Sequence, residues 1–282
     1  MKKFVKQVAG LALASALFLP NLASVAAQAD KPFDGQTVTV GVAGDDEVAV
    51  WEFVAEKAAE EGITLEVTLF SDYVQPNVAV ANGSLDLNAF QHIAYLESWN
   101  EENGENLQPL GYTYVSPLGL YSEKVEKVED LVDGATIAIP NDPTNGGRAL
   151  LLLEQAGVIE VDDAAGVLPT PNDVTKNDKN IKFEELDAAQ VAASLPDVDA
   201  AIINTNYALD NDLTVSEDAI FVDTAELDKV NEVYKNVLVT REDETENELY
   251  LHILSLYQTD EVAEKIDEET KGANIAAWDK AE

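Results

Sequence analysis

The chain has 282 residues, of which 54 are acidic and 17 are basic, and its formal net charge is −37. This charge argues against nucleic acid and anionic membrane surfaces as partners, because both repel an acidic protein. The sequence contains no cysteine, which excludes disulfides and thiol nucleophiles among its residues, and its length suits one large or two modest domains.

The first 29 residues have the pattern of a secretion signal. Lysines precede an apolar run at 8–19, which is too short to span a bilayer, and an A-x-A pattern at 27–29 is typical of a cleavage site. We therefore expect a signal peptide at 1–29 and cleavage before Asp30. Because no cysteine follows the signal, we expect a periplasmic or extracellular protein with no lipobox and no lipid anchor.

Strand and helix patterns alternate along the rest of the chain. Strands are predicted at 37–42, 63–70, 85–88, 107–115, 118–122, 135–139, 182–185, 200–203, 219–222 and 236–240. Helices are predicted at 47–61, 77–82, 90–100, 143–156, 188–193, 246–257 and 259–268. This alternation predicts an α/β fold with mainly parallel sheets.

The strand–helix groups fall into two sets, before and after about Tyr121, which predicts two α/β lobes. We place the first lobe at 30–117 and 238–282, and the second at 118–237. Ligands of such folds bind at the carboxyl ends of the strands, so we expect a ligand cleft between the lobes.

The stretch from Ile137 to Ile159, IAIPNDPTNGGRALLLLEQAGVI, predicts a strand, a tight turn and a helix capped by Asp142. A helix start directs free backbone N–H groups and a positive dipole end at one place. Together with Asn141, Asn145 and Arg148, that helix start suits a small carboxylate. The spacing also fits an ordinary strand–turn–helix with a solvent-facing arginine, and this alternative stays open.

Aromatic side chains gather in a second stretch, Phe70 to Leu96. Phe90, His92 and Tyr95 are predicted at the start of a helix, and Tyr73 lies in the loop after a strand. Aromatic residues at such places can form the wall of an apolar pocket. The pattern also fits Phe90 and Tyr95 as core residues, and a lone histidine such as His92 is more often structural than a ligand contact.

Asn204 follows the predicted strand 200–203, so it lies at the carboxyl end of a strand. Its amide can accept a hydrogen bond from an ammonium group and donate one to a carboxylate. The sequence lacks H-x-x-x-H, C-x-x-C, G-x-S-x-G and P-loop patterns. We therefore expect no metal, no cofactor and no catalytic residue.

Acidic residues are scattered along the whole chain and are not gathered in one tail. This pattern resembles the solvated acidic surface of proteins from salty environments, where dissolved ions screen the repulsion. We therefore expect an acidic surface and halophilic adaptation. Calcium binding is the alternative, but no D-x-D-x-D-G loop occurs.

Three segments resemble the NlpA-type methionine-binding proteins of bacterial ABC importers. They are FSDYVQPNVAVANGSLDLNAFQH (70–92), ATIAIPNDPTNGGRALLLLEQAG (135–157) and DVDAAIINTNYAL (197–209). The resemblance extends from about Thr37 to Tyr257. It implies a type II periplasmic-binding-protein fold, with methionine held between two α/β lobes and an ABC importer permease as partner.

The resemblance also implies roles for single residues. By motif position, Asn145, Arg148 and Asn204 match the residues that hold the amino-acid head group. The residues that match the wall around the ligand side chain are Tyr73, Phe90, His92 and Tyr95.

The chain departs from the family pattern at several positions, and it lacks the lipid-bearing cysteine that most members carry. The family's Pro-His-Ala-Glu run is replaced by the sequence DEVA at 46–49, and NYFQH-x-PYL is replaced by NAFQHIAYL at 88–96. We expect a monomeric solute-binding protein that captures methionine, or a close analogue, for an ABC importer. An enzyme of the same fold that acts on a small amino or carboxylic acid is the alternative.

Overall fold

The computed structural model describes residues 31–223 and 231–278. The predicted signal peptide, 1–29, lies outside the described residues. Everything below concerns the unit that begins at Phe33.

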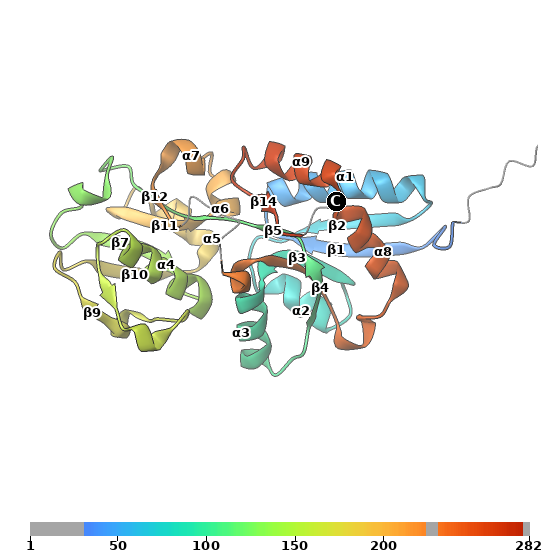
Figure 1. Ribbon diagram of the computed structural model, residues 1–282, viewed down its shortest axis with the longest axis horizontal. Coiled ribbons are helices and arrows are strands. Elements are labelled where there is room, and N and C mark those ends of the chain that lie inside the picture. Colours follow the sequence, from blue (N-terminus) through green and yellow to red (C-terminus); the bar gives the residue numbers. More distant parts are fainter. Residues whose placement is uncertain (1–30, 224–230, 279–282) are drawn as a thin grey trace, which may run out of the picture. The chain divides into compact units, whose positions relative to one another are not determined.

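A five-stranded sheet forms the first lobe, with helices packed against it (Figure 1). In spatial order its strands are β2 (Thr64–Leu69), β1 (Thr37–Val42), β3 (Leu87–His92), β13 (Asn236–Thr240) and β4 (Gln108–Tyr112). The helices of this lobe are α1 (Asp45–Glu60), α2 (Gln75–Ala81), α3 (Ile93–Asn103), α8 (Glu248–Tyr257) and α9 (Asp260–Glu269). Valine side chains of β1 are fully buried beneath α1 and α8, which explains why TVTVGV forms a strand.

The second lobe contains another five-stranded sheet. Its strands are, in order, β10 (Lys182–Leu186), β7 (Thr136–Pro140), β11 (Ala200–Asn204), β6 (Leu118–Tyr121) and β12 (Ala219–Val222). The helices are α4 (Pro143–Gln155), α5 (Ala188–Val191), α6 (Thr205–Leu209) and α7 (Val215–Asp218). A small ribbon, β8 (Glu160–Val161) with β9 (Val174–Lys176), extends beside them. Leu150, Leu152 and Leu153 of α4 are fully buried in the core.

The α/β prediction is confirmed, but the prediction of mainly parallel sheets is wrong. Each sheet contains two parallel and two antiparallel strand pairs. The antiparallel pairs are made by β6 and β13, the strands that each sheet receives from a chain segment crossing from the other lobe. Because no helix of the same lobe precedes them as a crossover, they are free to enter in the opposite direction.

The chain crosses from the first lobe to the second through β5 (Tyr114–Val115), which leads directly into β6. β5 pairs antiparallel with β14 (Ile275–Ala276), so a late segment of the chain supports this crossing. β13 belongs to the first sheet from Asn236 onward. The lobe boundaries at 117/118 and 237/238 stay a prediction.

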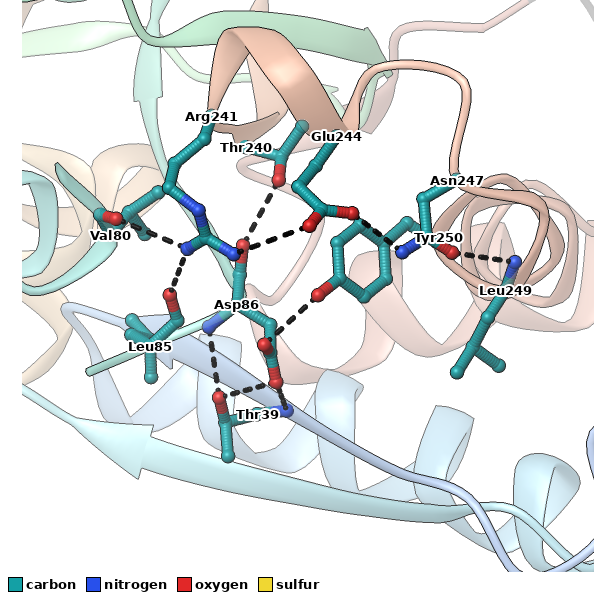
Figure 2. A network of polar contacts seen from close by, with 10 residues as sticks. All are labelled: Thr39, Val80, Leu85, Asp86, Thr240, Arg241, Glu244, Asn247, Leu249 and Tyr250. Carbon is teal, nitrogen blue, oxygen red and sulfur yellow. Dashed lines mark hydrogen bonds and ion pairs between the residues drawn. The ribbon is translucent and has the colours of Figure 1, made fainter. Parts of the chain in front are cut away.

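Polar side chains tie together the end of the first sheet where β3 begins (Figure 2). Asp86 accepts hydrogen bonds from the backbone N–H of Thr39 at 2.8 Å, from the Thr39 hydroxyl at 2.9 Å and from the Tyr250 hydroxyl at 2.9 Å. The guanidinium of Arg241 donates to the carbonyl oxygens of Val80 and Leu85. The network therefore links β1, β3, β13 and α8.

Asp86→Ala should lower the free energy of unfolding by about 1–3 kcal/mol, because it leaves the donors of Thr39 and Tyr250 without their acceptor. Urea unfolding followed by circular dichroism measures this loss. The exposed residue Glu105, changed to alanine, is the control and should stay within about 0.5 kcal/mol of the parent. Equal effects of the two changes would show that the network does not stabilise the sheet.

Candidate functional site

A cavity lies at the carboxyl ends of β3 and β11, between the two lobes, and encloses about 470 Å³, part of it open to solvent. Most of the residues predicted to bind ligand line it, namely Tyr73, Phe90, His92, Tyr95, Asn145, Arg148 and Asn204. Asn141 is exposed and is not part of the lining, and its backbone N–H donates to the Leu186 carbonyl at 2.8 Å.

Other lining residues were not selected from the sequence. These are Gln91, Tyr114, Ser116, Pro117, Thr205, Asn206, Asn236 and Asn274. Thr205 and Asn206 directly follow Asn204, so the end of that predicted strand was a usable signal for them. Asn274 carries no local signal, because only the pairing of β14 with β5 brings it to the cavity.

The aromatic side of the cavity consists of three rings in mutual contact. Tyr73 lies 5.6 Å from Phe90 and 5.9 Å from Tyr95 between ring centroids, and Phe90 lies 6.0 Å from Tyr95. Phe90 and Tyr95 also belong to a hydrophobic cluster of the first lobe. These two side chains are therefore part of the cavity lining and part of the core at the same time. The rings give the cavity an apolar, polarisable wall.

The start of α3 differs from the predicted helix at 90–100. Phe90 lies inside β3, whose six residues are all buried, and His92 ends the strand and caps α3. A strand buried on both faces shows no apolar–polar alternation, which is why its end was placed too early. Tyr95 is in the first turn of α3, as predicted.

His92 uses both ring nitrogens, one within the first lobe and one toward the second lobe. Its Nδ1 accepts the backbone N–H of Tyr95 at 3.1 Å, so the remaining proton is assigned to Nε2, which lies 3.3 Å from Oδ1 of Asn145. Burial, with the nearby positive charge of Arg148, lowers the pKa of His92 to about 3. The imidazole is therefore neutral at physiological pH, and it connects the backbone of Tyr95 with the Asn145 side chain through hydrogen bonds.

The amide of Asn145 is held by three partners. Its Nδ2 donates to the Asp142 carboxylate, with 3.0 Å to Oδ2, and its Oδ1 accepts from His92 and from Nδ2 of Asn204 at 3.0 Å. Asn204 is oriented by that bond, and its Oδ1 is buried without a hydrogen-bond partner. A buried acceptor of this kind needs a donor, which a ligand ammonium group can supply.

Arg148 is buried, with 5% of its side chain exposed, which excludes the alternative of a solvent-facing arginine. Its Nε and Nη2 lie 2.7 Å and 2.6 Å from Oδ2 of Asp223. Nη2 also donates to the Ser116 carbonyl at 2.8 Å, and the guanidinium carbon lies 4.6 Å from the ring centroid of Tyr234. The guanidinium is therefore fixed in one orientation at the cavity.

A family model described as NlpA lipoprotein matches residues 38–278. The chain belongs to the NlpA lipoprotein family. A relative from Vibrio cholerae, named probable D-methionine-binding lipoprotein MetQ, is 43% identical over 251 residues, which cover 88% of this chain and 91% of the relative. The D-methionine-binding lipoprotein MetQ of Escherichia coli K12 is 41% identical, over 87% of this chain and 90% of the relative.

Solved structures of similar proteins have the same fold. A nutrient-binding protein from Burkholderia cenocepacia bound to methionine is 42% identical, with a TM-score of 0.80 over 86% of this chain and 100% of that chain. A crystal structure of the methionine-binding protein MetQ is 39% identical, with a TM-score of 0.81 over 86% and 98% of the two chains. The predicted periplasmic-binding-protein-like fold of two α/β lobes is confirmed.

The comparisons correct the prediction of where the protein is found. From the absence of cysteine we expected a free periplasmic or extracellular protein without a lipobox. The matching family and the V. cholerae and E. coli relatives are described as lipoproteins, so that prediction is wrong. It depended on the signal pattern at 1–29 and on the absence of cysteine. No helix among the described residues combines the length and apolar character needed to cross a membrane.

Proposed function

We propose that this chain is a solute-binding protein that captures methionine, or a close analogue, between its two lobes and delivers it to an ABC importer. One observation carries the proposal: an aromatic wall and a fixed arginine line the same cavity. The names of the relatives support it, because they are methionine-binding lipoproteins, and one similar structure contains methionine.

In the proposed complex, Arg148 binds the ligand carboxylate through charge-assisted hydrogen bonds. The unpartnered Oδ1 of Asn204 accepts from the ammonium group, while His92 and Asn145 hold Asn204 in place. The rings of Tyr73, Phe90 and Tyr95 surround the thioether, whose sulfur makes favourable contacts with aromatic rings. Asn141 is left out of this complex because it does not line the cavity.

Mass spectrometry of the small molecules released from denatured protein tests the proposal. We expect methionine in the released fraction, and titration calorimetry with L- and D-methionine should then show one-to-one binding. Absence of binding to both enantiomers would refute the proposed function. A change in the amino acid during incubation would instead favour the enzyme alternative, for which the relatives, named as binding proteins, give no support.

Phe90→Ala should weaken methionine binding by roughly 1–3 kcal/mol, because a buried aromatic contact to the ligand is lost. Binding of alanine, which has little side chain to contact the wall, should change much less. Calorimetry with both amino acids measures the difference. Leu107→Ala is the control, because Leu107 belongs to the same hydrophobic cluster but does not line the cavity. Equal losses for both amino acids would assign Phe90 to the general core.

We also propose that residues 1–29 act as a secretion signal, that the protein is a monomer and that its acidic composition is an adaptation to salt. The pattern of the first 29 residues and the net charge of −37 support the first and third of these. N-terminal sequencing of the exported protein and light scattering in solution test the first two.

The melting temperature should rise from low salt to about 1 M sodium chloride, because ions screen surface repulsion beyond about 10 Å already at 0.1 M. Differential scanning calorimetry measures this change. A melting temperature that stays constant or falls would contradict the proposed adaptation.

A further inference from the structure

Asn206, on α6 of the second lobe, reaches two separate parts of the first lobe. Its Nδ2 donates to the carbonyl oxygen of Ala43, in the turn before α1. Its Oδ1 accepts the hydroxyl of Tyr73 at 2.6 Å. Both polar groups of the side chain are therefore used between the lobes, although Asn206 also lines the cavity.

Gly44 provides the space into which Asn206 fits. A Cβ atom at position 44 would lie 2.9 Å from Cβ of Asn206 and 2.5 Å from Oδ1 of Asp46. The backbone of Gly44 is extended, with φ −168°, a conformation that any residue adopts, so the glycine is needed for space alone. The Asp46 carboxylate can rotate away, but Cβ of Asn206 can retreat only if α6 itself moves.

Two further contacts extend this junction along α6. The backbone N–H of Asp45 donates to Oδ1 of Asp210 at 3.2 Å. The ring of Tyr207 lies 4.9 Å from the ring of Tyr73. The junction thus joins the start of α1, the loop before α2 and the whole of α6.

We propose that Asn206, seated against Gly44, is the contact that fastens the second lobe onto the first and so closes the methionine cavity. This inference rests on the proposed function. Asn206 acts as a positioning residue, since its amide is committed to Ala43 and Tyr73. By holding the Tyr73 hydroxyl, it also fixes one ring of the aromatic wall.

Three single variants test the contact. Asn206→Ala removes both hydrogen bonds between the lobes, and Gly44→Ala blocks the approach of α6 without adding a group to the cavity lining. Asn211→Ala is the matched control, because the Asn211 amide donates to Tyr207 within its own lobe. Methionine affinity by calorimetry, dissociation by stopped-flow fluorescence and the radius of gyration by X-ray scattering are measured for each.

Asn206→Ala and Gly44→Ala should each bind methionine about 10- to 100-fold more weakly, as expected for one or two lost hydrogen bonds. The loss should appear in the dissociation rate, because the proposed contact holds the two lobes together around the bound methionine. Both variants should also have a larger radius of gyration than the parent at saturating methionine. If Asn206 only contacted the ligand and did not help to close the lobes, Asn206→Ala would leave the radius of gyration unchanged. The control Asn211→Ala should match the parent in every measurement.

A double variant distinguishes loss of the contact from misfolding as the cause of weaker methionine binding. In the Asn206→Gly background no Cβ opposes position 44, so Gly44→Ala should cost much less affinity there than in the parent. An equal cost in both backgrounds, or parental dissociation rates and radii in the single variants, would overturn the closing role. Failure of the parent to bind methionine would instead refute the proposed function and, with it, the closing role that rests on that function.

Discussion

Arg148→Met should weaken methionine binding by roughly 30-fold to several thousand-fold. In the proposed complex the ligand carboxylate is desolvated, and removing its cationic partner leaves a buried charge unpaired, which costs about 2–5 kcal/mol. Arg148→Lys should recover only part of the affinity, because a single ammonium cannot replace the planar fork of donors. Titration calorimetry of both variants and the parent measures these changes.

Stability without ligand should fall as well. If Arg148 contacted only the ligand, its removal would leave the free energy of unfolding of the ligand-free protein unchanged. Arg148 is instead buried in an ion pair with Asp223. Removing it leaves the Asp223 carboxylate without its counter-ion, at a cost of about 3–5 kcal/mol. The double variant Arg148→Met with Asp223→Asn should regain stability but not methionine binding. If Arg148→Met binds within about threefold of the parent, Arg148 does not hold the head group.

The free energy of unfolding should decrease as pH rises toward about 8, because of Glu47. This side chain is 5% exposed; it accepts the Tyr114 hydroxyl and the backbone N–H of Ala43. Burial, with the nearby carboxylate of Asp46, raises the pKa of Glu47 from 4.5 to about 8. The folded protein thus favours the protonated form, so this stabilisation is complete below pH 4.5 and is lost as pH rises through about 8.

The loss should amount to roughly 2–5 kcal/mol over that range, since one pKa unit corresponds to about 1.4 kcal/mol. Urea unfolding at a series of pH values measures it. Glu47→Gln removes the titrating group and should flatten the curve above about pH 6. Below that the curve should still fall with rising pH, because burial also raises the pKa of Asp46, to about 6. A parent curve that rises between about pH 6 and 8 would contradict the buried, protonated state of Glu47.

Local patterns predicted much of the cavity but not the contacts that complete it. Arg148 was identified because the Asp142-Pro143 helix start is a pattern of a few adjacent residues, and it places Arg148 in the first turns of α4, beside the cavity. Its partner Asp223 lies 75 positions further along the chain, and no local pattern connects the two. The contacts of Asn206 have no local pattern either, because its partners Ala43 and Tyr73 belong to the other lobe. Asn141 was selected because the turn is polar, but an exposed turn position need not face the ligand.

The pairing of strands sets an order in which the chain can complete its folding during synthesis. All strands of the second sheet lie between positions 118 and 222, so that lobe is complete once this stretch has left the ribosome. The first sheet still lacks β13 at that moment, and the crossing strand β5 lacks its partner β14. The lobe that begins first is therefore finished last, and its unpaired strand edges stay exposed until β13 and then β14 emerge.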